Sequence, residues 1–168
     1  DTDSGELTNV GTPENITEAH DTETFGSCDG PLDASVAAPH GLGTEVADDG
    51  TEFLYVVNHG GRESIEVFSV DGEALTWVGC AVLPEASMGN GVVADPDSDG
   101  FYVTNFLDPT DMEASFEKAF AGENTGEILH WTPADGWSVV EGSEMSTPNG
   151  IAVSEDGGSI YVASWGGR

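Results

Sequence analysis

One sequence pattern occurs three times along the chain and constrains the fold more than any other feature. Its clearest copy is MSTPNGIAVSEDGGSIYVAS at 145–164, and the earlier copies are NGVVADPDSDGFYVTN at 90–105 and PHGLGTEVADDGTEFLYVVNH at 39–59. Each copy has a His or Asn before Gly and an aliphatic residue, then an acidic turn with Gly, then a Tyr-Val strand. The copies begin about 50 and 59 residues apart, a spacing typical of β-propeller blades with four short strands each.

The repeat predicts an all-β fold, a single partial β-propeller domain. Within it we expect an atypical N-terminal unit at 1–38, a blade at 39–85, a blade with a helical insertion at 86–142, and half a blade at 143–168. At 168 residues the chain is short for a closed propeller, which needs at least about four blades of roughly 40–50 residues. We therefore expect about three blades of a longer propeller, with missing blades or another chain completing it.

Alternation of apolar and polar residues places the strands of the two complete blades. The predicted strands lie near 42–47, 53–58, 64–70 and 75–82 in the first blade, and near 91–94, 101–105, 126–132 and 137–141 in the second.

A short amphipathic helix is predicted near 110–121. Thr110-Asp111-Met112-Glu113 has the pattern of a capping box, and Met112, Phe116 and Phe120 follow at four-residue spacing. This apolar stripe either roofs a substrate pocket or packs on the blade, and the sequence leaves both open.

The N-terminal unit contains a weaker copy of the repeat. VGTPENIT at 10–17 has the pattern of the start of an inner strand, with Glu14 where the later copies carry His or Asn. Residues 24–26 are the predicted hairpin partner of this strand.

The charge balance excludes several kinds of partner. Thirty-two acidic residues face three basic ones, giving a formal net charge of −29, which repels nucleic acid and anionic membranes. No apolar run approaches the roughly 18 residues of a membrane span. We expect a secreted or periplasmic protein, or alternatively one from the cytoplasm of a halophile. Cys28 and Cys80 lack metal-ligand spacing, and the sequence leaves their pairing open.

The position that begins each inner strand is the candidate site. In a propeller this strand runs along the central channel, so Glu14, His40, Asn90 and Asn149 would converge at one height. One carboxylate and two amide oxygens are hard ligands that suit calcium, whereas zinc would call for more His or Cys. The alternative interpretation is that Asn before Gly only tolerates a turn conformation.

Several of these motifs, in this order, resemble the paraoxonase/arylesterase group: PHGL, LYVVNH, IEVF, GNGVVA, FYVTN and PNGIAVSEDGGSIYVA. The last is also similar to gluconolactonases and regucalcin, and VGTPENI resembles the N-terminal segment of the group. The resemblance implies a six-bladed propeller that holds calcium in its channel and hydrolyses lactones or aryl esters.

The resemblance also implies roles for individual residues. Glu14, Asn90 and Asn149 match ligands of the catalytic calcium, while His40 and His59 match a histidine pair in which His40 is the base. Calcium would polarise the ester or lactone carbonyl, and a histidine would take a proton from water.

The sequence departs from the family where a second, structural calcium is held, because Asn15 and Gly91 replace its acidic ligands. Two alternatives remain: a non-catalytic propeller, as a binding scaffold or a truncated remnant, and a strictosidine-synthase-like propeller without calcium. A serine hydrolase is disfavoured, because the sequence has no G-x-S-x-G motif.

Overall fold

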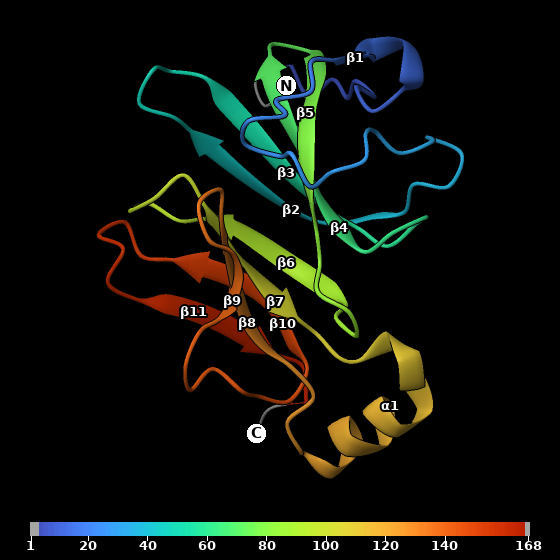
Figure 1. The fold of residues 1–168 in the computed structure, drawn as a ribbon, viewed down its shortest axis with the longest axis vertical. Helices are drawn as coiled ribbons and strands as arrows, with labels where there is room; N and C mark the ends of the chain where they lie inside the picture. The colour runs from blue at the N-terminus through green and yellow to red at the C-terminus, as the bar shows by residue number, and fades with distance from the viewer. Residues whose placement is uncertain (1–3, 167–168) are drawn as a thin grey trace.

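Antiparallel hairpins closed by acidic turns build most of the protein, and the computed structural model describes residues 4–166 (Figure 1). The described residues form three β-sheets and one short α-helix, with the sheets following one another along the chain. The predicted all-β propeller fold, present in part and with a helical insertion, is confirmed.

The first sheet contains four antiparallel strands that follow each other in the chain, with a fifth strand added at one edge. Its order is β1-β5-β4-β3-β2. The strands are β1 (Ile16–Glu18), β2 (Pro39–Val46), β3 (Glu52–Asn58), β4 (Ser64–Asp71) and β5 (Ala74–Val82). Strands β2 to β5 begin and end within three residues of the predicted ranges. Gly72, with φ of 60°, makes the tight turn between β4 and β5.

The second and third sheets repeat this arrangement. The second has the order β6-β7-β8-β9, with β6 (Gly89–Ala94), β7 (Phe101–Asn105), β8 (Glu127–Thr132) and β9 (Gly136–Val139). The third is the hairpin of β10 (Pro148–Val153) and β11 (Ile160–Ser164).

The N-terminal unit differs from its prediction. After a 3₁₀ turn (η1, Pro13–Asn15), β1 pairs in parallel with β5, the last of the four antiparallel strands counted from β2. Residues 24–26 lie in turns. The segment at 10–17 is therefore not an inner strand.

The physical cause lies in the residues that follow β1. Cys28 forms a disulfide with Cys80 of β5, and the buried Phe25 ring fills the space that Gly79 leaves open. An added Cβ at Gly79 would lie 2.4 Å from that ring. The disulfide and this packing hold the N-terminal segment along the outer edge of the blade.

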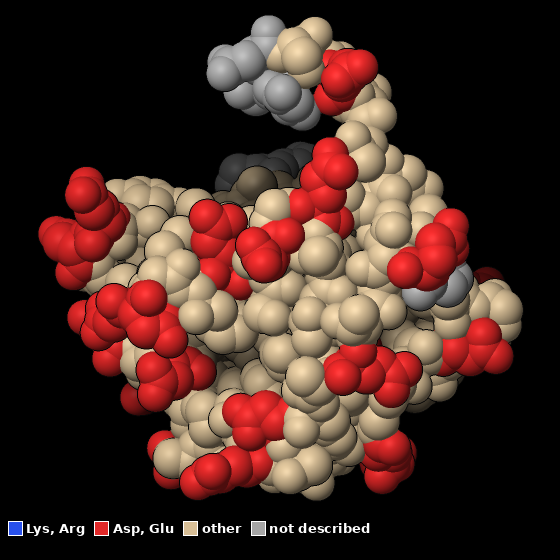
Figure 2. All heavy atoms as spheres, turned by 90° about the horizontal axis from the view of Figure 1, so that it is seen from above, with Lys and Arg blue, Asp and Glu red and all other residues tan. Residues whose placement is uncertain are grey.

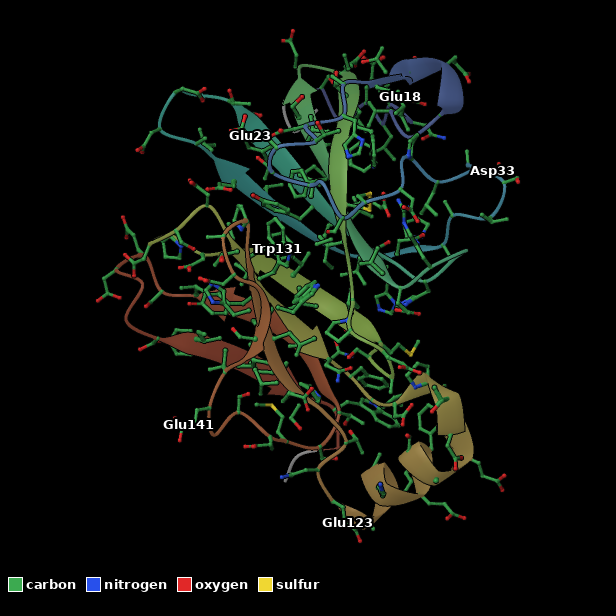
Figure 3. The ribbon with its side chains drawn as sticks, viewed as in Figure 1. Glu18, Glu23, Asp33, Glu123, Trp131 and Glu141 are labelled. Carbon is green, nitrogen blue, oxygen red and sulfur yellow. A yellow bond between two sulfur atoms is a disulfide. The ribbon has the colours of Figure 1, made fainter. Side chains whose placement is uncertain are left out.

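Aromatic rings fill the space between the first two sheets. Trp131, labelled in Figure 3, stacks on Phe101 with ring centroids 4.9 Å apart and on Phe25 at 5.3 Å. Tyr55 of the first sheet reaches Phe101 at 5.2 Å. Burial of these rings supplies apolar contact between blades and fixes how their inner strands meet.

The helical insertion is confirmed as α1 (Met112–Ala121), preceded by a 3₁₀ turn (η2, Pro109–Asp111). Its N-cap is Asp111, whose carboxylate accepts a hydrogen bond from the Ala114 amide at 3.1 Å, so the Thr110 capping box is wrong by one residue. Met112 and Phe120 are exposed, and the buried helix residues are Ser115 and Ala119. The predicted apolar stripe is therefore largely not packed on the blade.

Nearly all charged side chains of the protein are carboxylates, 32 against three Lys and Arg. The face drawn in Figure 2 carries many Asp and Glu side chains spread over its whole extent, with no Lys or Arg visible among them. In the described part of the chain, no helix is both long enough and apolar enough for a membrane span.

Candidate functional site

The same backbone irregularity occurs at the start of all three inner strands. In β2, β6 and β10 the pairing shifts register between Pro39 and Leu42, between Gly89 and Val92, and between Pro148 and Ile151. Between the two paired positions, the inner strand advances three residues while its partner advances two, and this extra residue is a β-bulge. Bulges re-aim side chains and are common beside active sites.

Three of the predicted site residues lie in these bulges: His40, Asn90 and Asn149. His40 is exposed, Asn90 is 8% exposed and Asn149 is partly buried. The sequence repeat therefore corresponds to a structural repeat that gives these side chains equivalent positions in successive blades.

Glycines let the inner strands approach each other closely. An added Cβ at Gly41 would lie 2.1 Å from the carbonyl oxygen of Asn90, and one at Gly91 would lie 2.8 Å from that of Asn149. The bulge of β2 therefore contacts that of β6, and the bulge of β6 contacts that of β10. The backbones at His40, Asn90 and Asn149 therefore lie next to one another in successive blades.

A buried hydroxyl joins the second and third of these strands. Thr104 of β7 is fully buried, and its hydroxyl donates to the carbonyl oxygen of Asn149 at 2.6 Å. The same hydroxyl accepts from the amide of Gly91 at 2.8 Å. This side chain satisfies two backbone groups at adjacent bulges and fixes their relative position.

The two predicted histidines lie in contact. Nε2 of His59 is 3.1 Å from Nδ1 of His40, and the rings meet edge to face. On its other side, Nδ1 of His59 lies 2.9 and 3.1 Å from the two carboxylate oxygens of Glu63. Three polar side chains, Glu63, His59 and His40, are therefore hydrogen-bonded in a row from the loop after β3 to the exposed start of β2.

The loop that carries His59 is held by Asn58, which is 2% exposed. Its amide nitrogen donates to the carbonyl oxygens of Gly60 at 2.9 Å and Arg62 at 2.8 Å. Its amide oxygen accepts from the Ala38 amide at 2.9 Å, two residues before His40. One buried side chain therefore positions both histidines.

The hydrogen bond that Asn58 accepts from the segment before the inner strand recurs in the second blade. In the second blade, Asn105 accepts from the Met88 amide at 2.9 Å, as Asn58 does from Ala38. The residues that follow these strands, His59, Phe106 and Trp165, each donate a backbone hydrogen bond to the segment before the inner strand. They occupy equivalent positions, so α1, which begins soon after Phe106, lies at the same end of the blades as the histidine pair.

Glu14 does not lie beside the bulges of the inner strands. It is exposed and precedes β1, which lies four strand spacings from β2 across the first sheet, roughly 19 Å at 4.8 Å each. Glu18, which ends β1, is labelled at the outer part of this sheet in Figure 3. The predicted convergence of Glu14 with the other site residues is wrong, because its strand pairs at the outer edge.

The donor set bears on the predicted calcium. Asn90 and Asn149 offer amide oxygens, which are hard ligands that calcium accepts, and both come from bulges in contact. Among residues 4–166 no cluster of three or more His, Cys, Asp or Glu side chains forms a metal site. The donors fit calcium in kind but supply only part of the six to eight oxygens it takes.

Sequence reasoning missed Glu63, Thr104 and Asn58. Each acts through hydrogen bonds that only the folded chain brings together. The signal that could have found Asn58 is its recurrence as Asn105 at the end of the equivalent strand.

The fold and the site together define a partial β-propeller whose successive inner strands present a histidine and two asparagines at equivalent bulges. A family model for Arylesterase matches residues 4–167, so the chain belongs to the Arylesterase family.

Named relatives agree with this assignment. The chain is 33% identical over 141 residues to serum paraoxonase/arylesterase 1 of Mus musculus, covering 79% of this chain and 37% of that protein. It is 31% identical over 129 residues to serum paraoxonase/lactonase 3 of Oryctolagus cuniculus, covering 74% and 35%. The chain thus spans little more than a third of the length of these relatives.

A solved structure confirms the fold. A gluconolactonase from Xanthomonas campestris superposes with a TM-score of 0.51 at 13% sequence identity, covering 77% of this chain and 35% of the other. At that identity the likeness establishes the propeller-type architecture alone.

Proposed function

We propose that this chain contributes a catalytic histidine pair and part of a calcium site to a hydrolase of lactones or aryl esters. The observation that carries the proposal is the contact of His59 with His40 at 3.1 Å, on the strand whose bulge adjoins that of Asn90. The names of its relatives, arylesterase and lactonase, support this class of substrate.

The proposed role of each histidine follows from its exposure. His40 is open to solvent, so water and substrate can reach it, and it acts as the general base that takes a proton from the attacking water. His59 is partly buried behind it and orients the His40 ring. Histidine is the side chain that most often serves as a general base in enzymes.

Asn90 and Asn149 are the proposed calcium ligands, with the remaining oxygens coming from water, substrate or segments outside these residues. Calcium, when bound, would supply polarisation of the scissile carbonyl and stabilisation of the developing oxyanion. The Thr104 hydroxyl bonds to backbone groups of both bulges, and this link supports a site shared between them.

Exposed aromatic rings supply an apolar wall for the substrate in this proposal. Trp165 lies 6.0 Å from Phe120 of α1 and 6.5 Å from Phe106, measured between ring centroids. Phe120 and Trp165 are 75% and 57% exposed. Since Phe106 and Trp165 are the counterparts of His59, this wall lies at the histidine end of the blades and suits the aryl or alkyl part of an ester.

The test is hydrolysis of phenyl acetate and of a δ-lactone, in millimolar calcium and in magnesium at matched ionic strength. We expect calcium-dependent hydrolysis that falls by about 10²–10⁴-fold in His40→Gln. His20→Gln is the matched control, because His20 contacts the Phe25 carbonyl and Trp77 rather than the inner strands. Equal rates for wild type and His40→Gln, or no hydrolysis at all, would contradict the proposal and favour a non-catalytic propeller.

We also propose that the protein is exported, being secreted or periplasmic, and that further blades or another chain complete its channel. The Cys28–Cys80 disulfide supports export, because disulfides persist mainly in oxidising compartments. Thiol labelling of the protein taken directly from its source organism tests this: labelled cysteines before reduction would favour the cytoplasm instead.

A further inference from the structure

Glu63 extends the histidine pair by one residue, although no sequence pattern marks it. Its carboxylate lies 2.9 Å from Nδ1 of His59 and 3.1 Å through its second oxygen. We propose that Glu63 is a positioning residue that fixes the tautomers of both His59 and His40. This inference rests on the proposed function, in which His40 accepts a proton.

The argument begins with the hydrogen-bonding capacity of a carboxylate. An ionised carboxylate only accepts hydrogen bonds, so the proton shared with Glu63 must reside on Nδ1 of His59. In neutral His59, Nε2 then carries no hydrogen and accepts. Because that Nε2 lies 3.1 Å from Nδ1 of His40, the hydrogen between the rings belongs to His40.

The consequence concerns His40, the exposed member of the three hydrogen-bonded side chains. With its hydrogen on Nδ1, neutral His40 has a bare lone pair on Nε2, the atom that is free to act as a base. As the water oxygen bonds to the substrate carbonyl carbon, the π bond of that carbonyl breaks and its electron pair moves to the carbonyl oxygen. At the same time the O–H bond of the water breaks and its proton passes to this Nε2. The opposite tautomer would carry a hydrogen there and could not accept a proton, much as a wrong histidine tautomer disables a serine protease.

The surroundings keep the Glu63 carboxylate available to His59. The neighbouring Arg62 pairs instead with the buried Glu66, through Nε at 3.0 Å and a terminal nitrogen at 2.9 Å. Asn58 fixes the loop backbone at Gly60 and Arg62, between the histidine and the glutamate. The Glu63 carboxylate is thus held within reach of the His59 imidazole, while the adjacent Arg62 pairs with Glu66.

The direct test is NMR of the four histidines in protein labelled with ¹⁵N, at a pH where they are neutral, with assignments from single His→Gln variants. We expect both His59 and His40 to carry their hydrogen on Nδ1. Glu63→Ala should abolish this preference. Glu63→Lys, whose ammonium only donates, should move the hydrogen of each ring to Nε2. Glu52→Lys is the control, because Glu52 is exposed at the opposite end of β3.

The inference is overturned if wild-type His59 carries its hydrogen on Nε2, or if both tautomers are unchanged in Glu63→Ala and Glu63→Lys. Thermal unfolding of each variant shows whether it is folded. If Glu63→Lys does not fold, the wild type and Glu63→Ala still decide between these outcomes.

Kinetics separate this inference from the proposed function. If the wild type hydrolyses esters, kcat should fall at least about 10-fold in Glu63→Ala while KM changes little, because Glu63 contacts His59 rather than substrate. An unchanged kcat would overturn the inference and leave the proposed function standing. Absence of wild-type hydrolysis would count against the proposed function, whereas the NMR result would still decide the role of Glu63.

Discussion

Replacing Thr104 by valine tests whether a single hydroxyl holds adjacent inner strands together. Valine has nearly the same shape but cannot hydrogen-bond, so the Gly91 amide and the Asn149 carbonyl, both in half-buried residues, lose their bonds of 2.8 and 2.6 Å to the buried Thr104. A buried backbone group left unsatisfied costs about 1–3 kcal/mol. Two such groups predict that the free energy of unfolding falls by about 2–6 kcal/mol, a large part of the roughly 5–15 kcal/mol that stabilises most domains.

Urea unfolding monitored by tryptophan fluorescence measures this change, and Thr104→Ser is the matched control. Serine keeps the hydroxyl and removes one methyl group, so its loss should be only about 1 kcal/mol. Thr104→Val should therefore be the less stable variant. If Thr104→Val matches the wild type while Thr104→Ser is weaker, the position contributes apolar packing, and the argument that its hydroxyl aligns the two bulges fails.

Three further predictions concern the disulfide, the strand contact and an acidic turn. Replacing Cys28 and Cys80 by alanine opens a link across 52 residues, so the free energy of unfolding in urea should fall by about 4 kcal/mol; no change would contradict the loop-entropy argument. Gly41→Ala places a Cβ 2.1 Å from the backbone of β6 and should cost about 3 kcal/mol or more in the same assay, whereas Gly150→Ala, with open space around its Cβ, should be near neutral. Burial raises the Asp95 pKa, but hydrogen bonds from Ser and amide groups and a nearby His outweigh it and hold the pKa below its ordinary value. The stability that Asp95 contributes is therefore present above pH about 4 and lost as the pH falls through its folded pKa; thermal unfolding should show Asp95→Asn less stable than wild type at pH 7, with a gap that closes below pH 4.

The repeat could be predicted from sequence because the patterns that define it lie within short segments of the chain. Alternating apolar residues and acidic Gly turns define each hairpin, and the residue before Gly falls at the same bulge in β2, β6 and β10. The order of the motifs then indicated the family. His40 could be placed by the repeat, whereas His59 was indicated only by the resemblance to the family.

The N-terminal unit could not be predicted in this way. β1 has only three residues, and its partner is chosen by tertiary contacts, namely the Cys28–Cys80 link and the Phe25 ring against Gly79. A short resemblance to the inner-strand pattern therefore assigned Glu14 to the channel, although it lies at the outer edge. Glu63 escaped notice for a related reason, because its role depends on a side-chain contact across a loop.

Calcium-selective stabilisation tests the central claim, that the adjacent bulges form one ligand site. The measurement is thermal unfolding of the wild type and Asn149→Ala in calcium and in magnesium at matched ionic strength, with the exposed Asn15→Ala as control. At one hundred times its dissociation constant, calcium should stabilise the wild type by about 2.7 kcal/mol, a rise of roughly 5–11 °C. The account predicts that Asn149→Ala loses the calcium-selective part of this rise and Asn15→Ala keeps it. Equal effects of the two ions on wild type, or an undiminished calcium effect in Asn149→Ala, would contradict it.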